Sequence, residues 1–427
     1  MTYKNKIIQL ALPAMAENVL QMLMGVVDNY LIAQVSLIAV SGVSVANNII
    51  TIYQAIFIAL GATISSLIAK SLGEKDHSKV RRYQSEALFI TLILSLILGC
   101  LSFVFGKSIL NLLGTDSGIT QSGGLYLAIV GGLIIGLGLM TTFGAFLRAQ
   151  GKARLPMYVS LLSNVLNAIL SALSVFVFGW GIAGVAISTA ISRFVGVTLL
   201  ASQLPISSII KEMKPRIDGE LLRIALPAAG ERLMMRAGDV IIVVIIVKFG
   251  AKVVAGNAIG ETLTQFNYMP GMGVATATII LVAHGVGQGN RREIRGLVKD
   301  SYIIAVVLMS LVGAMVFTLG GQLTSLFTGD ALAREASLIV LFYSFVGSPA
   351  TAGTLIYTAV WQGLGNAKLP FYATGFGMWM IRIISGYLLG VNIGLGLAGV
   401  WLATLADNIF RWGFLYYRYR RYLEKDR

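Results

Sequence analysis

The chain has 427 residues, of which 56% are hydrophobic and 12% are charged, and its formal net charge is +14. This composition excludes a water-soluble globular protein and indicates a polytopic membrane protein. The charge does not indicate nucleic-acid binding, because Lys and Arg lie in short clusters between apolar runs. One cysteine and two histidines exclude an internal disulfide and a cysteine-rich or histidine-rich metal site.

The first apolar stretch, residues 7–34, is long enough to cross a bilayer yet contains Glu17, Gln21 and Asp28. A carboxylate in the middle of a spanning helix costs roughly 2.5 to 3.5 kcal/mol on insertion scales, so it indicates a site. The helical spacing of the three residues predicts one polar face that looks inward. The apolar run exceeds that of a signal peptide, so we expect it to remain as a membrane anchor.

Apolar runs bounded by charged residues predict six membrane spans in each half. The first six are expected at residues 7–34, 37–69, 84–106, 120–147, 155–178 and 181–204. A polar linker with Lys211, Lys214, Pro215 and Arg216 precedes spans at 220–248, 253–284, 298–321, 334–361, 369–391 and 396–417. This predicts an N-terminal six-helix lobe at 1–204, a cytoplasmic linker at 205–219 and a C-terminal six-helix lobe at 220–427.

The two halves repeat each other. Residues 11–14 recur as residues 225–228, an offset of 214, and Glu17 falls on Glu231 at that offset. Toward the end of each half the offset becomes 215. Because each repeat has an even number of spans, the halves share one topology. We therefore predict an all-α integral membrane fold of twelve transmembrane helices in two six-helix bundles, related by a pseudo-two-fold axis along the membrane normal.

The distribution of Lys and Arg predicts the orientation. With the N-terminus inside, most of these residues lie on the cytoplasmic side, and those on the other side are Lys107, Lys248, Lys252 and Arg334. The positive-inside rule then places both termini in the cytoplasm. We expect a multi-pass protein of the cell membrane.

Several motifs together resemble one family. They are Pro13 and Asp28 in the first span, residues 67–73 (LIAKSLG), residues 148–152 (RAQGK) leading into 155–158 (LPMY), residues 378–382 (MWMIR) and residues 396–401 (GLAGVW). Over essentially its whole length the chain resembles the multidrug and toxic compound extrusion (MATE) transporters, and the last two motifs look like the DinF-like branch. The resemblance implies export of drugs or metabolites driven by inward flow of H⁺ or Na⁺. Composition and periodicity alone lead only to a two-bundle transporter.

The resemblance also implies roles for residues of the first half. Asp28 matches the family's coupling carboxylate on the first helix, and Gln21 and Asn167 match residues of the N-terminal cleft. Thr189 matches a hydroxyl beside them. Many members have an Asp four residues after this Asn, where the chain has Ser171. This change removes a carboxylate from the cation site and favours H⁺ over Na⁺. The candidates for ion coupling in this half are Asp28, Asn167, Ser171 and Thr189.

Asp28 is predicted to carry a proton. A neutral carboxyl group costs less than a charged one in a dry helix bundle, and opening to water allows the group to ionise. One pH unit supplies about 1.4 kcal/mol, which is enough to bias two conformations of similar energy. The alternative is that Asp28 only holds helices together through hydrogen bonds to Asn or Ser side chains.

The second half carries more embedded charge. Arg232, Arg236 and Asp239 are spaced i, i+4 and i+7, so Asp239 is predicted to pair with an arginine on its own helix. Glu261 occupies the position that Asn47 has in the first half. The resemblance gives Arg382 and Asp407 a role in gating or coupling. The candidates for coupling or gating in this half are Glu231, Asp239, Glu261, Arg382 and Asp407.

Polar stripes and flexible side chains predict the substrate cleft. Asn47 and Gln54 belong to a stripe on the second span, and Gln265 and Tyr268 belong to one on the eighth. Methionine side chains suit an adaptable cleft, and buried acids favour cations. We expect the cleft to be lined by Gln21, Asn47, Gln54, Met235, Gln265 and Tyr268. The alternative for any one of them is packing or lipid contact.

These features predict a secondary active multidrug exporter that works as a monomer in membrane lipid. Inward flow of H⁺, in preference to Na⁺, would drive export of cationic or amphipathic small molecules by alternating access. The alternative is a related flippase of lipid-linked oligosaccharide or lipid II. A flippase needs a basic cleft for pyrophosphate, whereas the embedded acids here outnumber the embedded arginines. Neither an enzyme nor a cofactor is expected, because the sequence lacks Gly-x-Ser-x-Gly, His-Glu-x-x-His and nucleotide-binding patterns.

Overall fold

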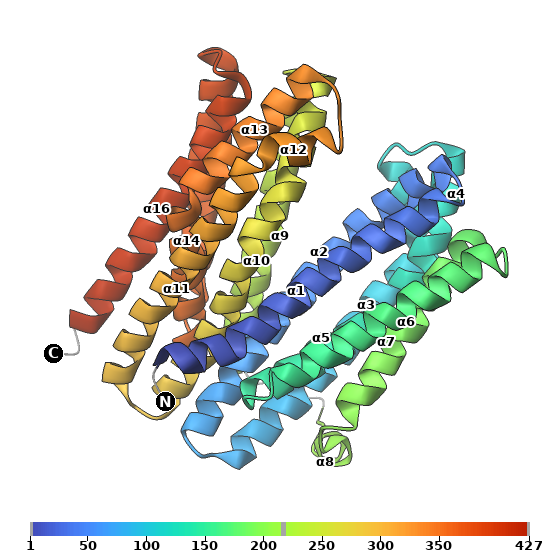
Figure 1. Cartoon of the computed structure of the whole chain (residues 1–427). Helices are drawn as coiled ribbons and strands as arrows, with labels where there is room; N and C mark the ends of the chain where they lie inside the picture. Colours follow the sequence, from blue (N-terminus) through green and yellow to red (C-terminus); the bar gives the residue numbers. More distant parts are fainter. Residues whose placement is uncertain (1–2, 215–218, 425–427) are drawn as a thin grey trace. The chain divides into compact units, whose positions relative to one another are not determined.

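The computed structural model describes residues 3–214 and 219–424, and its elements there are helices. Pro215 and Arg216 of the predicted linker lie outside the described residues. The first half contains α1 (Tyr3–Ala33), α2 (Leu37–Gly73), α3 (His77–Leu112), α4 (Ser117–Tyr126), the π-helix η1 (Leu127–Gly131), α5 (Ile135–Ala149), α6 (Arg154–Phe176), α7 (Gly181–Ala201) and α8 (Ile206–Lys211). The second half contains α9 (Gly219–Val247), α10 (Ala251–Gly287), α11 (Arg291–Thr318), α12 (Gly320–Ser325), α13 (Ala331–Val346), α14 (Ser348–Gly363), α15 (Lys368–Gly375), the π-helices η2 (Phe376–Ser385) and η3 (Leu388–Asn392), and α16 (Gly396–Glu424) (Figure 1).

The predicted spans correspond to these helices in order. Among the described residues, 8 helices are long and apolar enough to cross a membrane, or up to 10 when each of two bent pairs counts as one span. The helices α9 and α16 lie outside this set, and each is 29 residues long with embedded charges. With them, the helices account for all the spans that the sequence predicts.

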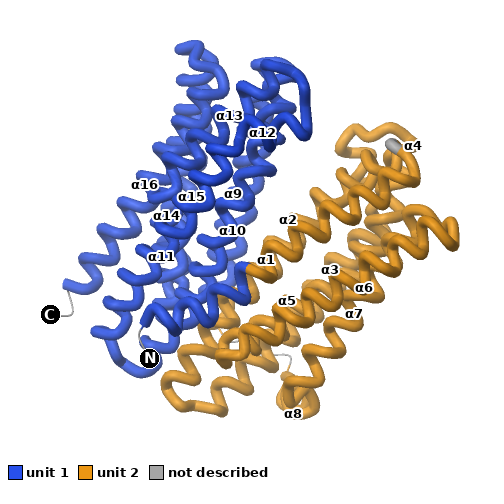
Figure 2. The backbone as a smooth tube through the Cα atoms, in the orientation of Figure 1, with its two compact units in different colours: residues 1–15, 223–427 blue, residues 16–222 orange. Residues whose placement is uncertain are grey.

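The chain divides into two compact units (Figure 2). One contains Ala16–Leu222, and the other contains Met1–Met15 together with Arg223–Arg427. The chain therefore passes from one unit to the other within α1 and again within α9. The start of α1 is tied to the second-half helices of its unit: the Lys6 Nζ donates to Glu293 Oε1 at 2.9 Å.

The repeat is visible in the backbone. The fourth span bends by 42° between Gly131 and Ile135, and the tenth bends by 58° at Gly347, which lies 214 residues after Leu133. Gly151 and Gly365, also 214 apart, both have φ +80°, a left-handed conformation that glycine adopts without steric cost. Both halves therefore carry the same breaks at the same positions.

The second half has one residue more than the first, and the π-helices η2 and η3 lie in the segment that contains this insertion. The offset is 214 at Gly365 and 215 at Gly396, whose φ of +59° matches that of +55° at Gly181. Between them, η2 and η3 occupy Phe376–Ser385 and Leu388–Asn392. A π-helix bonds i to i+5 and accommodates an inserted residue within a helix. The inserted residue therefore changes the helical register of η2, and the span accommodates it without a break.

The helices α2 and α10 are the central helices of the two units, α2 in the unit Ala16–Leu222 and α10 in the other. In their most apolar windows 72% and 67% of residues are buried, compared with 22% in α1. Gly42 on α2 lies so close to α4 that a Cβ there would be 2.7 Å from the backbone nitrogen of Gly123. Its repeat partner Gly256 on α10 similarly lies against the carbonyl oxygen of Ala333 on α13. A glycine at the same repeat position therefore allows a close approach between helices in each unit.

We predict that Gly42→Ala and Gly256→Ala each destabilise the protein, by about 1–3 kcal/mol, because the added methyl group forces the backbones apart. Thermal unfolding of the purified protein in detergent measures the effect. Gly413→Ala is the control, since a Cβ at Gly413 on α16 meets nothing within 4 Å. Equal unfolding midpoints for all three variants would contradict the prediction.

Candidate functional site

Asp28 of α1 is hydrogen-bonded to Asn167 of α6, and both residues lie in the unit Ala16–Leu222, the first-half unit. The amide Nδ2 of Asn167 donates to both carboxylate oxygens of Asp28, at 3.1 and 3.4 Å. The amide oxygen of Asn167 accepts from Ser171 at 3.2 Å and from Thr189 of α7 at 3.4 Å. Asp28 is half-buried, and the other three side chains are buried. The structure thus brings together the four residues that the sequence assigns to ion coupling.

Two further residues join this cluster. The guanidinium of Arg193 interacts electrostatically with the Asp28 carboxylate and with the Tyr126 hydroxyl, and that hydroxyl also interacts with Thr189. The sequence analysis assigns neither Arg193 nor Tyr126 to a site. The spacing of Arg193, one helical turn from Thr189, is the signal that places it on the same face of α7.

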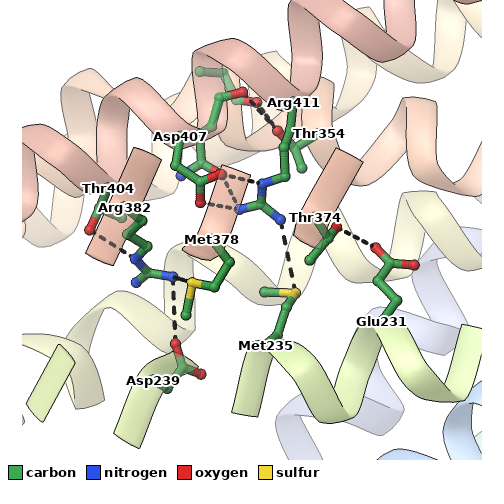
Figure 3. A network of polar contacts seen from close by, with 12 residues as sticks. Glu231, Met235, Asp239, Thr354, Thr374, Met378, Arg382, Thr404, Asp407 and Arg411 are labelled. Atoms are coloured by element: carbon green, nitrogen blue, oxygen red, sulfur yellow. Dashed lines mark hydrogen bonds and ion pairs between the residues drawn. The ribbon is translucent and has the colours of Figure 1, made fainter. Parts of the chain in front are cut away.

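The second-half unit holds an acid–arginine–threonine cluster. Arg382 of η2 donates from Nε to Thr404 Oγ1 at 3.0 Å and from Nη1 to Asp239 Oδ1 at 3.5 Å (Figure 3). Glu261 of α10 interacts electrostatically with Asp239 and Arg382. The predicted pairing of Asp239 with an arginine of its own helix is therefore wrong, because Arg382 from another helix reaches its carboxylate.

The clusters of the two halves occupy related positions. Thr404 is the repeat partner of Thr189 at an offset of 215, and at the same offset Arg382 stands where the first half has Asn167. Each threonine contacts the residue 22 positions before it. The second half thus has a fixed positive charge where the first half has a neutral amide.

Asp407 forms a separate, fully buried ion pair on α16. Arg411 Nε and Nη2 each donate to one carboxylate oxygen of Asp407, both at 2.8 Å, and the Arg411 and Asp407 side chains are 5% and 0% exposed. Arg411 Nη1 also lies 3.9 Å from the sulfur of Met235 (Figure 3). Gly377 of η2 packs against the pair, since a Cβ there would overlap Asp407 Oδ1. Sequence reasoning missed Arg411, which its i, i+4 spacing from Asp407 could have revealed.

The residues predicted to line the substrate cleft are spread over four helices. Gln21 of α1 and Gln265 of α10 are exposed, whereas Asn47 and Gln54 of α2, Met235 of α9 and Tyr268 of α10 are half-buried. Among the described residues, no hydrogen bond joins the side chains of Gln21, Asn47 and Gln54 to one another within their unit, and none joins those of Met235, Gln265 and Tyr268 within theirs. Their role in substrate binding stays a prediction.

We predict that Asp407→Asn destabilises the protein by about 3 kcal/mol, because Arg411 keeps a buried charge without a partner. The unfolding midpoint in detergent measures this loss. The double variant Asp407→Leu with Arg411→Met should recover most of it, since apolar side chains of similar size replace the whole pair. A single variant as stable as the wild type would contradict a buried ion pair at this position.

Comparison with protein families gives a match to the MatE family model over residues 13–173 and 227–388. The chain is 30% identical to a probable multidrug resistance protein NorM of Thermotoga maritima, over 96% of this chain and 90% of that protein. It is 26% identical to the uncharacterized transporter YisQ of Bacillus subtilis, over 96% and 92%. It is also 25% identical to the multidrug export protein MepA of Staphylococcus aureus, over 93% and 90%.

Solved structures share the fold. A MATE protein crystallised in complex with MaD3S aligns with a TM-score of 0.92 at 21% identity, covering 100% of this chain and 98% of that one. An outward-facing multidrug resistance MATE family transporter aligns with a TM-score of 0.92 at 21% identity, covering 98% and 96%. These alignments confirm the predicted all-α fold of twelve transmembrane helices in two bundles. With the family model matched over both halves, the chain belongs to the MatE family, whose members are membrane transporters and not enzymes.

Proposed function

We propose that this transporter is a secondary active multidrug exporter, in which inward flow of H⁺ drives the export of cationic or amphipathic compounds by alternating access. Support comes from family membership and from relatives named as multidrug resistance or export proteins. We place it as a monomer in the cell membrane with both termini cytoplasmic and propose that it belongs to the DinF-like branch. Its two halves would act as six-helix lobes at 1–204 and 220–427, joined by a cytoplasmic linker.

The observation that carries the proposal is the bonding of Asp28. Among the described residues, the side chain that donates hydrogen bonds to its carboxylate is the buried amide of Asn167, and Arg193 interacts with the carboxylate only electrostatically. An amide donor stabilises the ionised acid moderately and does not prevent protonation, as a direct bidentate arginine would. Ser171 donates to Asn167 and supplies a hydroxyl where a second carboxylate would favour a metal cation. Proton coupling therefore fits the cluster better than Na⁺ coupling.

In the second half, Asp239, Glu261 and Arg382 are our candidates for coupling or gating. Arg382 bridges α9 and α16 through Asp239 and Thr404, and the contact with Asp239 is long at 3.5 Å. A long ion pair on a half-buried arginine is easier to break than a buried bidentate pair. Asp407, held at both oxygens by Arg411, would then support the gate as part of its scaffold.

For the substrate, we propose a cleft lined by Gln21, Asn47, Gln54, Met235, Gln265 and Tyr268. Its methionine, tyrosine and amide groups suit amphipathic compounds, and the acids of the two clusters attract cations. The flippase alternative predicts cationic groups free to bind pyrophosphate. Instead, two of the embedded arginines, Arg382 and Arg411, are bound to carboxylates of the chain itself.

We predict that Asp28→Asn lowers pH-driven export by at least about tenfold, because the side chain keeps its shape and polarity but no longer exchanges a proton. Export of ethidium from proteoliposomes under an imposed pH gradient provides the measurement. Binding of ethidium to the purified variant should remain detectable.

Asp116→Asn is the matched control, since it makes the same chemical change at an exposed residue whose side chain makes no capping bond. The same assay with a Na⁺ gradient in place of the pH gradient tests the coupling ion. Undiminished pH-driven export by Asp28→Asn would rule out Asp28 as the proton carrier, and export driven by Na⁺ alone would rule out proton coupling.

A further inference from the structure

An acid occurs at the same place in both halves, but its partner differs. Glu17 of α1 and Glu231 of α9 are repeat partners at an offset of 214. The residue 131 positions further along is Arg148 in the first half and Gln362 in the second. The repeat thus replaces a cation with a neutral amide while it keeps the carboxylate.

In the first half the carboxylate is neutralised by an ion pair. Arg148 Nη1 donates to Glu17 Oε2 at 2.9 Å, and the two side chains are only 14% and 18% exposed. At this distance and burial the charged forms of both groups stabilise each other. Glu17 therefore serves as one member of a structural ion pair.

In the second half the equivalent carboxylate, that of Glu231, accepts hydrogen bonds from neutral donors. Glu231 is 6% exposed, and its Oε1 accepts from the Thr374 hydroxyl at 3.0 Å (Figure 3). Its Oε2 accepts from the Gln362 amide at a longer 3.5 Å. In the part of the chain that the structure describes, no ion pair includes Glu231.

Two cations act on Glu231 from a distance. Arg232 is the next residue on α9, and Arg411 comes from α16. Arg411 is already bound to Asp407 through two hydrogen bonds of 2.8 Å, so its charge is largely compensated. The groups that contact Glu231 from α14 and α15 are the amide of Gln362 and the hydroxyl of Thr374, which do not titrate.

These partners suit both protonation states of a carboxyl group. A threonine hydroxyl donates to a carboxylate and, after rotation, accepts from a protonated carboxyl, and a glutamine amide offers both a donor and an acceptor. Arginine only donates, so it suits the ionised form alone. An acid that is buried without a direct counter-ion takes the neutral form more readily than its ion-paired twin.

We infer that Glu231 is a proton-binding site of the second half, created by the replacement of the Arg148 equivalent with Gln362, while Glu17 keeps its ion pair with Arg148. This rests on the proposed function only in that the bound proton would be part of the coupling cycle. The site takes up a proton at acidic pH and releases it at alkaline pH, with Thr374 and Gln362 holding the carboxyl group in both states.

Infrared difference spectra of the purified full-length protein between acidic and alkaline pH test this, through the carbonyl stretching band of protonated carboxyl groups. Glu231→Gln should remove one carboxyl component from the band. Gln362→Arg should remove the same component, because it recreates the first-half ion pair. Glu17→Gln should leave the band unchanged.

The reciprocal variant gives an independent test. Arg148→Gln copies the second-half arrangement into the first half and should add one carboxyl component, which the double variant Glu17→Gln with Arg148→Gln should lack. An unchanged band in Glu231→Gln would overturn the inference, as would Arg148→Gln without a gain when the variant elutes as a folded monomer. The spectra need no transport, so this site and the proposed export function fail separately.

Discussion

An ionisable side chain inside a membrane-embedded helix bundle must find a partner in the protein, because lipid offers it none. This chain satisfies the constraint in three ways. Asp407 is paired at both oxygens by Arg411, Asp28 is bound by the amide of Asn167, and Glu231 is held by neutral donors alone. The first way suits a scaffold, because breaking the pair leaves a buried charge, whereas we propose that the other two leave the acid able to exchange a proton.

The repeat retains the backbone and changes the chemistry. The two bent spans, the left-handed glycines Gly151 and Gly365, and the packing glycines Gly42 and Gly256 are shared between the halves. The residues that contact the buried acids are not shared, since neutral groups in one half are replaced by arginine in the other, and the reverse. Asymmetry of this kind lets two lobes with one architecture hold different charges, and in our proposal only some of their acids respond to pH.

The π-helix η2 contributes to this asymmetry. It carries Gly377, which makes room for the Asp407–Arg411 pair, and Arg382, which reaches both Asp239 and Thr404. A π-helical turn holds more residues than an α-helical turn, so the inserted residue changes which side chains face the interior. An arginine therefore lies where the register of the first half has an asparagine.

The sequence by itself determined the membrane class, the order of the spans, the internal repeat and the acids worth attention, because apolar length and the cost of embedded charge are local properties. It also led, by resemblance, to Asp28 and the three first-half residues around it. Only the tertiary structure decided the partners. Arg148 lies 131 residues from Glu17, and Arg382 lies 143 residues from Asp239, so helix packing and not spacing along one helix brings each pair together. The same packing shows that Glu231, an exact repeat of Glu17 in sequence, faces a neutral amide instead of a guanidinium.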